Sequence, residues 1–362
     1  MVHYLLVWHT GLLLWFSQVK SILCLSIKLI VILLQMLHSI PNKEDISSAK
    51  ERISEYIHAT PVLSSQLLNE KFGANLFFKC ENFQKAGSFK SRGATNAILS
   101  LSSSQIENGV ATHSSGNFAQ ALARAADILN VPSYIVMPNN APKVKIDAVL
   151  GYGGIITFCE PNLPAREETL AKVIGKTGAI EIHPYNNYDI IAGQGTATVE
   201  FCQEINNLDV ILCPVGGGGL ISGTALSASY FGNNISVIAC EPKGADDAFR
   251  SIKAGKILPS INPKTIADGL LTSLGELNFP IIQKYVDEIV TVSEDSIIMA
   301  MKLIYERLKI VIEPSSAVPL AAIIENKVNV SGLNVGIIVS GGNIDLDNFS
   351  WSQTITKLPN YQ

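Results

Sequence analysis

Short apolar runs alternate with longer amphipathic stretches from about residue 41 onward. We predict a strand at each of six almost continuously apolar runs: residues 75–79, 134–137, 155–158, 210–214, 236–240 and 335–340. Strands that lack polar alternation are typical of parallel sheets buried on both faces. The pattern therefore favours a parallel sheet over an antiparallel one.

Helical patterns fill the segments between these runs. The spacing of apolar residues predicts helices at residues 89–101, 118–129, 143–150, 165–174, 196–204 and 296–309. Strand–helix alternation over about 300 residues indicates an α/β fold with helices on both faces of the sheets. No low-complexity tract or long linker interrupts it, so we expect two domains without a flexible connector.

Residues 1–40 differ from the rest of the chain. They contain no acidic residue and only two bases, Lys20 and Lys28, and their apolar runs cover residues 4–16 and 22–40. The first run is too short for a bilayer, and Lys28 inside the second costs about 2.5–3.5 kcal/mol on insertion scales. The charged start and cleavage site of a secretory signal are missing. A membrane anchor remains open, and we favour an added leader or gene-model artefact.

Composition narrows the class of protein. The chain has 362 residues, 47% of them apolar, which suffices for a sizeable core. The net charge is −4, or −6 from 25 bases and 31 acids without residues 1–40, and it argues against nucleic-acid binding. Six scattered cysteines without metal-ligand spacing predict free thiols, no zinc site and a cytoplasmic location.

Lys90 is the first candidate for chemistry. It follows Gly87 and Ser88 at the start of a predicted helix, among aromatic residues. Partial burial near a helix N-terminus makes an amine a poorer cation, so more of it is free to attack a carbonyl. Taken alone, Lys90 fits a surface position in the first turn of a helix better than a catalytic one.

Two further segments offer backbone N–H groups to an anion. Small polar residues from Ser114 to Asn117 precede a helix, where they suit a carboxylate or phosphate but also an ordinary N-cap. Four glycines, Gly216 to Gly219, join a strand to a helix and can wrap around a phosphate, the alternative being a flexible turn. No P-loop lysine follows the glycines, and they do not follow the first strand of a dinucleotide fold.

Ser340 completes this set at the end of the last predicted strand, where ligands of open α/β sheets bind, although taken alone its segment fits an ordinary turn better. An amine able to form an imine, a phosphate cup, an anion-binding turn and a neutral hydroxyl all suit pyridoxal phosphate. The motifs are FQKAGSFKSRGA, THSSGNF, GQGT, PVGGGGL, TIADG, IEPSSA and SGGN. On these motifs, residues 46–346 resemble the serine racemase and serine/threonine dehydratase family of fold-type II pyridoxal-phosphate enzymes.

The resemblance implies the architecture. The family has two open, mostly parallel sheets with helices on both faces, and its cofactor lies in the cleft between the domains. We therefore expect an extension at residues 1–40, a large cofactor-binding domain at 41–108 and 187–362, and a small domain at 109–186.

The resemblance also implies roles for individual residues. Lys90 would hold the cofactor as an imine and remove the substrate's Cα proton, and Ser115 would serve the opposite face, which allows racemisation. Ser340 would meet the pyridine nitrogen, and a neutral partner there favours β-elimination. The other implied cofactor contacts are Phe89, Asn117 at the 3-hydroxyl, and Gly216, Gly217, Gly218, Gly219 and Leu220 at the phosphate. The implied substrate-binding turn is Ser114, Ser115, Gly116 and Asn117.

Two more ligands follow from the resemblance. Glu241, Ala245 and Asp247 would bind Mg²⁺ or Ca²⁺ through two carboxylates and a carbonyl oxygen, the alternative being a solvated acidic loop. ATP would bind as an activator between the subunits of a homodimer. The residues implied for ATP are Ser65, Lys85, Gln120, Tyr152, Lys309 and Asn343, with Ala86 in place of a threonine often present in that set.

Two positions depart from the family pattern. Phe118 replaces the usual histidine after the Ser114–Asn117 turn, so substrate choice could be altered. Tyr185 lies where racemases tend to have asparagine and dehydratases an aromatic residue, which favours dehydration slightly.

The implied activity is that of a serine racemase with serine/threonine dehydratase activity, which yields D-serine, and 2-oxo acid plus ammonia. The alternatives are a threonine/serine or 3-hydroxyaspartate dehydratase without significant racemase activity, and an inactive binding protein, for which Phe118 is the only support. A β-replacing synthase of the cysteine-synthase kind shares the fold, but SFKSRGA and TIADG argue against it. Nucleic acid is not expected as a partner, and membrane contact only through residues 1–40.

Overall fold

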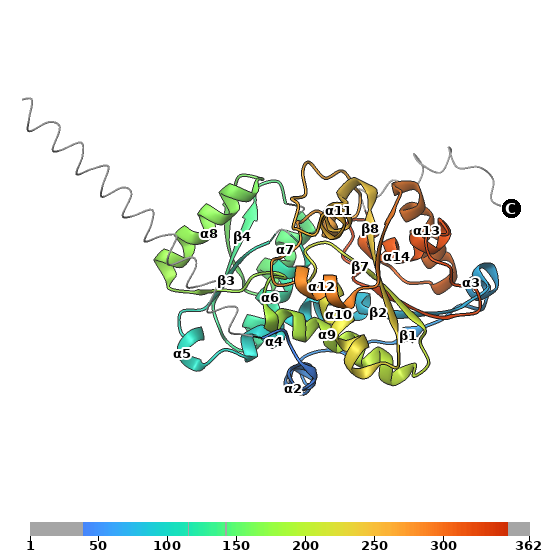
Figure 1. The fold of residues 1–362 in the computed structure, drawn as a ribbon. Helices are drawn as coiled ribbons and strands as arrows, with labels where there is room; N and C mark the ends of the chain where they lie inside the picture. The colour runs from blue at the N-terminus through green and yellow to red at the C-terminus, as the bar shows by residue number, and fades with distance from the viewer. Residues whose placement is uncertain (1–38, 115, 142, 347–362) are drawn as a thin grey trace, which may run out of the picture. The chain divides into compact units, whose positions relative to one another are not determined.

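The computed structural model describes residues 39–114, 116–141 and 143–346 (Figure 1). The prediction for residues 1–40 therefore lies almost wholly outside the described residues, and Ser115 lies outside them too. The chain divides into two units, Met1–Ile40 and Pro41–Gln362, and everything below concerns the second. In the described ranges, no helix has the length and apolar character needed to cross a membrane.

The larger sheet has six strands in the order β1-β2-β10-β7-β8-β9. β1 is antiparallel to β2, and every other pair is parallel. The strands are β1 (Val62–Leu63), β2 (Asn75–Cys80), β7 (Val210–Pro214), β8 (Ser236–Pro242), β9 (Glu288–Val292) and β10 (Asn334–Val339). The continuous apolar runs of the sequence thus form a mostly parallel sheet, as predicted.

Helices cover both faces of this sheet. Successive strand residues point to opposite faces, and Leu212 and Ile337 lie in one core while Ile211 and Ile338 lie in the other. The first core includes residues of α3 (Gln66–Phe72), α13 (Glu294–Leu308) and α14 (Pro314–Ile324). The second includes residues of α10 (Gly219–Phe231), α11 (Asp247–Ala254) and α12 (Phe279–Tyr285).

The smaller sheet has four parallel strands in the order β5-β4-β3-β6. They are β3 (Val110–His113), β4 (Ser133–Pro138), β5 (Ile155–Cys159) and β6 (Ile180–Glu181). Residues of α4 (Lys90–Leu99), α6 (Asn117–Ile128) and α7 (Lys143–Gly151) pack on one face, and those of α8 (Leu163–Thr177) on the other. A short helix, α5 (Ser103–Ile106), leads into β3.

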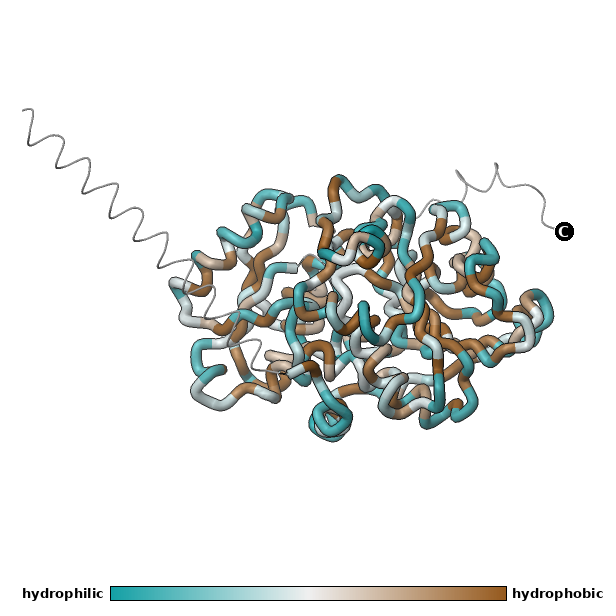
Figure 2. The backbone as a smooth tube through the Cα atoms, in the orientation of Figure 1, coloured by the Kyte–Doolittle hydropathy of each residue, from teal (hydrophilic) through white to brown (hydrophobic). Residues whose placement is uncertain are grey.

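Helix α9 (Tyr188–Glu204) contributes to both cores. Ile190 lies in the core of the smaller sheet, and Phe201 lies in the core of the larger one. Its glycines allow this close packing, because a Cβ on Gly193 would lie 2.7 Å from the Gly93 Cα of α4. Helix α2 (Lys43–Ile53) precedes these elements and is mostly hydrophilic, whereas Figure 2 shows the strands as mainly apolar.

Most predicted elements are present, and the α/β fold with two mostly parallel sheets is confirmed. All six predicted strands occur, as β2, β4, β5, β7, β8 and β10. The helix predicted from residue 196 begins earlier, at Tyr188. The domain boundaries stay a prediction; they assign α4 to the large domain, yet Ala94 and Ile98 of α4 lie in the core of the smaller sheet.

Candidate active site

Lys90 is the first residue of α4. The backbone N–H of Phe89 donates to the carbonyl oxygen of Ser340 (3.0 Å), which fixes the start of α4 to the end of β10. The Lys90 Nζ donates to the carbonyl oxygen of Pro184 (3.0 Å) and lies 5.7 Å from the centre of the Phe118 ring. Burial lowers the pKa of this amine to about 8. A lysine of this kind is more often neutral, and hence nucleophilic, than an exposed one.

A buried acid, Glu313, lies near this lysine. It is the N-cap residue of α14, and both of its carboxylate oxygens accept from the Asn117 amide, at 2.9 and 2.8 Å. Burial raises its pKa to about 7, with a further increase from Asp268, while Asn117, Lys145 and Lys90 oppose the rise. Sequence reasoning assigned Glu313 no role, although it is the acidic residue of the IEPSSA motif.

Asn117 connects this acid to a second predicted site. Its Oδ1 accepts from the Asn343 Nδ2 (3.0 Å), which also donates to the carbonyl oxygen of Ala86 (2.8 Å). Asn117 was predicted to bind the cofactor and Asn343 to bind ATP. The structure joins the two side chains by one hydrogen bond.

Gly216 to Gly218 lie between β7 and α10, Gly219 is the first residue of α10, and all four glycines are buried. Gly218 has φ +99, which favours glycine, and a Cβ on Gly217 would lie 2.4 Å from the Tyr185 ring. A Cβ on Gly216 would lie 3.0 Å from the Cα of Leu270. Gly218, the N-cap of α10, has no side chain, and within the described residues the N–H groups of the first turn are available to an anion. The loop therefore fits a phosphate group.

Tyr185 forms one wall of this loop. Its ring packs edge-to-face on His183, with the centroids 4.6 Å apart. The Nδ1 of His183 accepts from the backbone N–H groups of Tyr185 (3.3 Å) and Asn186 (2.9 Å). Burial, together with His113 and Lys90, lowers the pKa of His183 to about 3. His183 is thus a neutral ring with a fixed acceptor nitrogen, and sequence reasoning assigned it no role.

Ser340 directly follows β10 and is buried, as expected for a residue at a strand end inside the site. Its hydroxyl lies 3.0 Å from that of Ser316, which also hydrogen-bonds to Gly341. Ser88 forms a β-bridge with Gly341, so the segment before Lys90 is held against the end of the same strand. A neutral hydroxyl therefore lies in the chain segment that adjoins the lysine.

The turn from Ser114 to Asn117 leads from β3 into α6. The N–H of Ser114 donates to the Val136 carbonyl oxygen (3.1 Å), and a Cβ on Gly116 would lie 3.9 Å from the Lys145 Nζ. The role of Ser115 is not tested, since this residue lies outside the described part. Phe118 is only 2% exposed and belongs to the core of the smaller sheet, so its apolar ring fits the position where the family usually has histidine.

The predicted metal ligands lie around the start of α11. Glu241, the penultimate residue of β8, accepts from the N–H groups of Ala248 and Phe249 (2.9 Å each). One oxygen of Asp247 accepts from Leu274 (3.1 Å), while the other is buried without a hydrogen-bond partner. Burial raises the pKa of Glu241 to about 8 and that of Asp247 to about 6.

These properties fit a hard cation. Ala245, whose carbonyl would be the third ligand, lies in the turn that joins Glu241 to Asp247 and is buried. Two desolvated carboxylates gain from a bound Mg²⁺ or Ca²⁺, and the unpartnered oxygen of Asp247 is free to coordinate it. The described residues contain no group of three His, Cys, Asp or Glu side chains that could hold a metal.

The residues predicted for ATP lie on several elements. Ser65 is the N-cap of α3, Lys85 starts a 3₁₀ turn before α4, and Lys309 is the exposed C-cap of α13 with φ +61. Gln120 is buried in α6, and Tyr152 follows α7. Asn343 contacts the turn that Lys85 starts, because its side-chain amide donates to the carbonyl oxygen of Ala86.

A lysine of lowered pKa, a glycine loop at a helix N-terminus and a buried serine after a strand define an α/β enzyme that binds a phosphorylated aldehyde cofactor. The chain belongs to the family of pyridoxal-phosphate dependent enzymes, whose model matches residues 53–341.

Known proteins of this family are similar over most of the chain. The β-hydroxyaspartate dehydratase of Paracoccus denitrificans is 52% identical over 86% of this chain and 99% of its own length. The serine racemase of Dictyostelium discoideum is 51% identical over 85% of this chain and 96% of its own. The structure of maize serine racemase matches with a TM-score of 0.83 at 45% identity, over 85% of this chain and 95% of that one.

Proposed function

We propose that this enzyme is a serine racemase that also eliminates water from serine and threonine. The products are D-serine in the first reaction, and a 2-oxo acid with ammonia in the second. The observation that carries the proposal is Lys90: its pKa is lowered to about 8 beside a buried acid, in a chain 51% identical to a serine racemase. The 52% identity to a β-hydroxyaspartate dehydratase supports 3-hydroxyaspartate as a further substrate.

Pyridoxal phosphate, when bound, supplies an electron sink that makes the substrate's Cα–H acidic. Lys90 is the base that takes this proton, since its lowered pKa leaves part of the amine neutral near pH 8. Ser115 acts on the opposite face as the acid that returns a proton. The turn of Ser114, Ser115, Gly116 and Asn117 binds the substrate carboxylate, and Ser114 contributes its hydroxyl because its N–H donates to Val136.

Other residues would hold the cofactor. The N–H groups of Gly216 to Gly219 and Leu220 would bind the phosphate, and Phe89 lies beside the lysine. Asn117 would bind the 3-hydroxyl through an amide whose orientation is set by Glu313 and Asn343. Ser340 would meet the pyridine nitrogen with a neutral hydroxyl, and a neutral partner there favours β-elimination.

The cation and nucleotide sites are part of the proposal. Glu241, Asp247 and the Ala245 carbonyl bind Mg²⁺ or Ca²⁺, which is supported by the raised pKa values of both carboxylates. ATP binds at the predicted set in a homodimer, and the hydrogen bond from Asn343 to Asn117 gives it a route to the active site. The free thiols of the described cysteines, for example Cys213 and Cys240, fit a cytoplasmic location.

The proposal is tested by incubating the purified enzyme with L-serine, L-threonine and both 3-hydroxyaspartates while 2-oxo acid and enantiomer ratio are followed together. We expect 2-oxo acid from L-serine and accumulation of D-serine. Ser115→Ala should reduce D-serine formation about 100-fold while elimination from L-serine falls far less. Equal loss of both reactions would refute the role of Ser115, and elimination without D-serine in the wild type would favour the dehydratase alternative.

Two outcomes would replace the proposal. Turnover of O-acetylserine with sulfide, and not of hydroxy amino acids, would make the enzyme a β-replacing synthase. Retention of the cofactor without turnover of any of these amino acids would make it a binding protein.

A further inference from the structure

The first turn of α4 has an unusual support. The Phe89 side chain cannot cap this helix, and the N–H group of Gly93 donates instead to the Gln194 side chain (3.3 Å). The side chains of the two residues after Lys90 also hold this turn in place. The Ser91 hydroxyl donates to the carbonyl oxygen of Lys85, and Arg92 binds two carboxylates.

Arg92 uses its whole guanidinium group. Its Nε and Nη2 donate to the two oxygens of Glu81 (2.7 and 2.8 Å), and its Nη1 and Nη2 donate to the two oxygens of Glu200 (2.7 and 2.8 Å). The Nη1 also donates to the Thr196 hydroxyl (3.1 Å). The Arg92 side chain and Glu81 are fully buried, whereas Glu200 is 14% exposed. Two bidentate carboxylates fix the position and the plane of the guanidinium.

The two carboxylates that bind Arg92 belong to elements other than α4. Glu81 follows β2 directly, and Glu200 lies in α9. Lys79 of β2 donates to Glu200 (2.8 Å) and to the carbonyl oxygen of Thr60 (2.7 Å), whose hydroxyl donates to Glu81 (2.5 Å). The cluster of Lys79, Glu81, Arg92 and Glu200, here called the Arg92 cluster, has two cations and two carboxylates. It ties the first turn of α4 to the larger sheet on one side and to α9 on the other.

We propose that Arg92 is a positioning residue for Lys90: anchored by Glu81 and Glu200, it sets the place of the first turn of α4 and so aims the lysine amine. The inference rests on the proposed function for the role of Lys90. Burying matched charges adds little net stability compared with well-packed apolar residues, whereas it does select one geometry. A displacement of about 1 Å at a reacting group is worth about 100-fold in rate.

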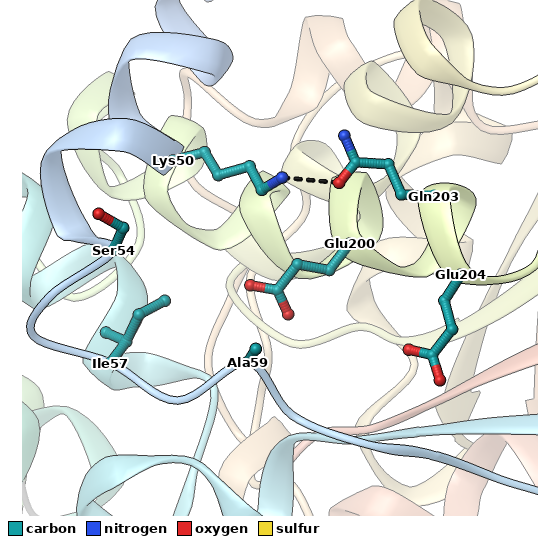
Figure 3. Close-up of a pocket in the computed structure, with 7 residues that line it drawn as sticks. All are labelled: Lys50, Ser54, Ile57, Ala59, Glu200, Gln203 and Glu204. Carbon is teal, nitrogen blue, oxygen red and sulfur yellow. Dashed lines mark hydrogen bonds between the residues drawn. The ribbon is translucent and has the colours of Figure 1, made fainter.

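A surface pocket gives access to this cluster. The pocket has a volume of about 450 Å³ and is lined by Lys50, Ser54, Ile57, Ala59, Glu200, Gln203 and Glu204 (Figure 3). Glu200 is the exposed member of the cluster, with 14% of its side chain accessible against 0 to 1% for the other three. Ala59 lies between His58 and Thr60, and the Arg92 Nη2 approaches the His58 carbonyl oxygen and the Thr60 hydroxyl (3.4 Å each). A small guanidinium ion that enters this pocket can therefore reach the carboxylates if Arg92 is shortened.

The test compares Arg92→Ala and Arg92→Lys with a matched control, Arg52→Ala. Arg52 also binds α4, through a 2.6 Å hydrogen bond to Asn96, but at the opposite end from Lys90. We measure kcat, KM, the visible circular dichroism of the bound cofactor and the melting temperature of each holoenzyme. Arg92→Ala should lower kcat about 100-fold with KM within about threefold, and should reduce the visible dichroism. The kcat and visible dichroism of Arg92→Lys should lie between those of Arg92→Ala and those of the wild type. Arg52→Ala should have the wild-type values.

Guanidinium chloride at low millimolar concentration gives the decisive result. Guanidinium should raise the kcat of Arg92→Ala by about tenfold or more and should restore its visible dichroism. It should leave the kcat and dichroism of Arg92→Lys and of the wild type unchanged. If Arg92→Ala does not fold, Arg92→Lys and Glu200→Gln carry the test, and each should lower kcat and dichroism at an unchanged KM.

The inference is overturned if a folded Arg92 variant keeps the kcat and dichroism of the wild type, or if guanidinium restores nothing. It is also overturned if Arg52→Ala is impaired equally, because the effect would then be general loosening of α4. If the wild type binds the cofactor but turns over no hydroxy amino acid, the proposed function fails, while the dichroism still tests the placement of Lys90.

Discussion

Two groups of buried charged side chains in this enzyme differ in whether they are paired with charges of opposite sign. In the Arg92 cluster, two cations face two carboxylates at hydrogen-bond distance. At the start of α11, Glu241 and Asp247 are both buried, and the cation that acts on them, Arg250, is itself paired with Asp246 at 2.7 Å. Side chains of the fold neutralise the first group, whereas no cation of the described residues forms an ion pair with Glu241 or Asp247.

The presence or absence of ion-pair partners distinguishes charged side chains with a structural role from those proposed to bind a ligand. A buried carboxylate without a counterion has a raised pKa and gains strongly from a cation. Lys90 belongs with the second kind, because no carboxylate of the described residues lies within ion-pair distance of its amine and its pKa is lowered to about 8. The unmatched charges therefore coincide with the proposed cofactor and metal sites.

The largest effect is expected at Lys90. Lys90→Ala should lower kcat by about 10⁴-fold or more, because both covalent attachment and proton transfer are lost. The free energy of unfolding of the cofactor-free variant should not fall, since the substitution removes an unmatched buried amine. Steady-state kinetics and urea unfolding check these expectations. Substantial remaining activity, or a clear loss of stability, would place Lys90 among the structural charges.

Lys79→Met, unlike Lys90→Ala, should lower the stability of the protein. It leaves Glu200 with one cation fewer inside the Arg92 cluster, so the free energy of unfolding should fall by about 3 kcal/mol. Urea unfolding of the cofactor-free protein measures this loss. The exposed pair Lys143–Asp147 provides the control, because Lys143→Met should change stability by less than about 0.5 kcal/mol. An equal effect of the two variants would remove the distinction between matched and surface charges.

If Glu241 and Asp247 form the proposed metal site, the stability of the protein should depend on pH. The pKa of Glu241 is raised to about 8, above its value in the unfolded chain, so the metal-free protein loses stability as pH rises from about 4.3 toward 8. Mg²⁺ should reverse this loss, because it binds the deprotonated carboxylates. The increase in melting temperature on adding Mg²⁺ should be larger at about pH 8.5 than at about pH 6.

Variants of neighbouring acids provide the controls for this prediction. Glu241→Gln should abolish the Mg²⁺ effect, and Asp246→Asn, a substitution of an acid beside the site, should retain it. An effect of Mg²⁺ that does not depend on pH, or that survives Glu241→Gln, would exclude these carboxylates as the ligands.

The smallest effect concerns the titration of Lys90. Cofactor added to the cofactor-free full chain should rebind faster as pH rises through about 8, since only the neutral amine attacks. Glu313 favours the charged amine, so Glu313→Gln should move this midpoint to lower pH. The return of the visible cofactor band measures the rate. Glu325→Gln, at the other end of α14, should leave the midpoint unchanged; a shift there, or none with Glu313→Gln, would separate Glu313 from Lys90.

Sequence reasoning predicted the sheets better than the helices. The strands form from local runs such as residues 210–214, whose apolar character follows directly from burial on both faces. Helix α9 was predicted too short because Gly193 and Gly195 weaken a helical pattern, whereas in the fold they let α4 and α10 approach. Helix α14 was not predicted, since Pro314, Pro319 and two serines are typical of a turn.

The candidate site was predictable where its chemistry resides in one segment. Lys90, the glycine loop and Ser340 each lie in a short motif that stands out in the sequence. Glu313 was not found, because its raised pKa arises from burial between segments far apart in the chain. The same holds for Arg92 and Glu200, which are 108 residues apart and meet only in the fold.

The most direct test of this account is to locate the covalent attachment of the cofactor. The purified enzyme is treated with borohydride, which fixes an imine irreversibly, and is digested and analysed by mass spectrometry. We expect the phosphopyridoxyl group on the peptide that contains Lys90, at Lys90, and its absence from Lys90→Ala prepared in parallel. Attachment to another lysine such as Lys85, or retention of no cofactor by the wild type, would contradict the account.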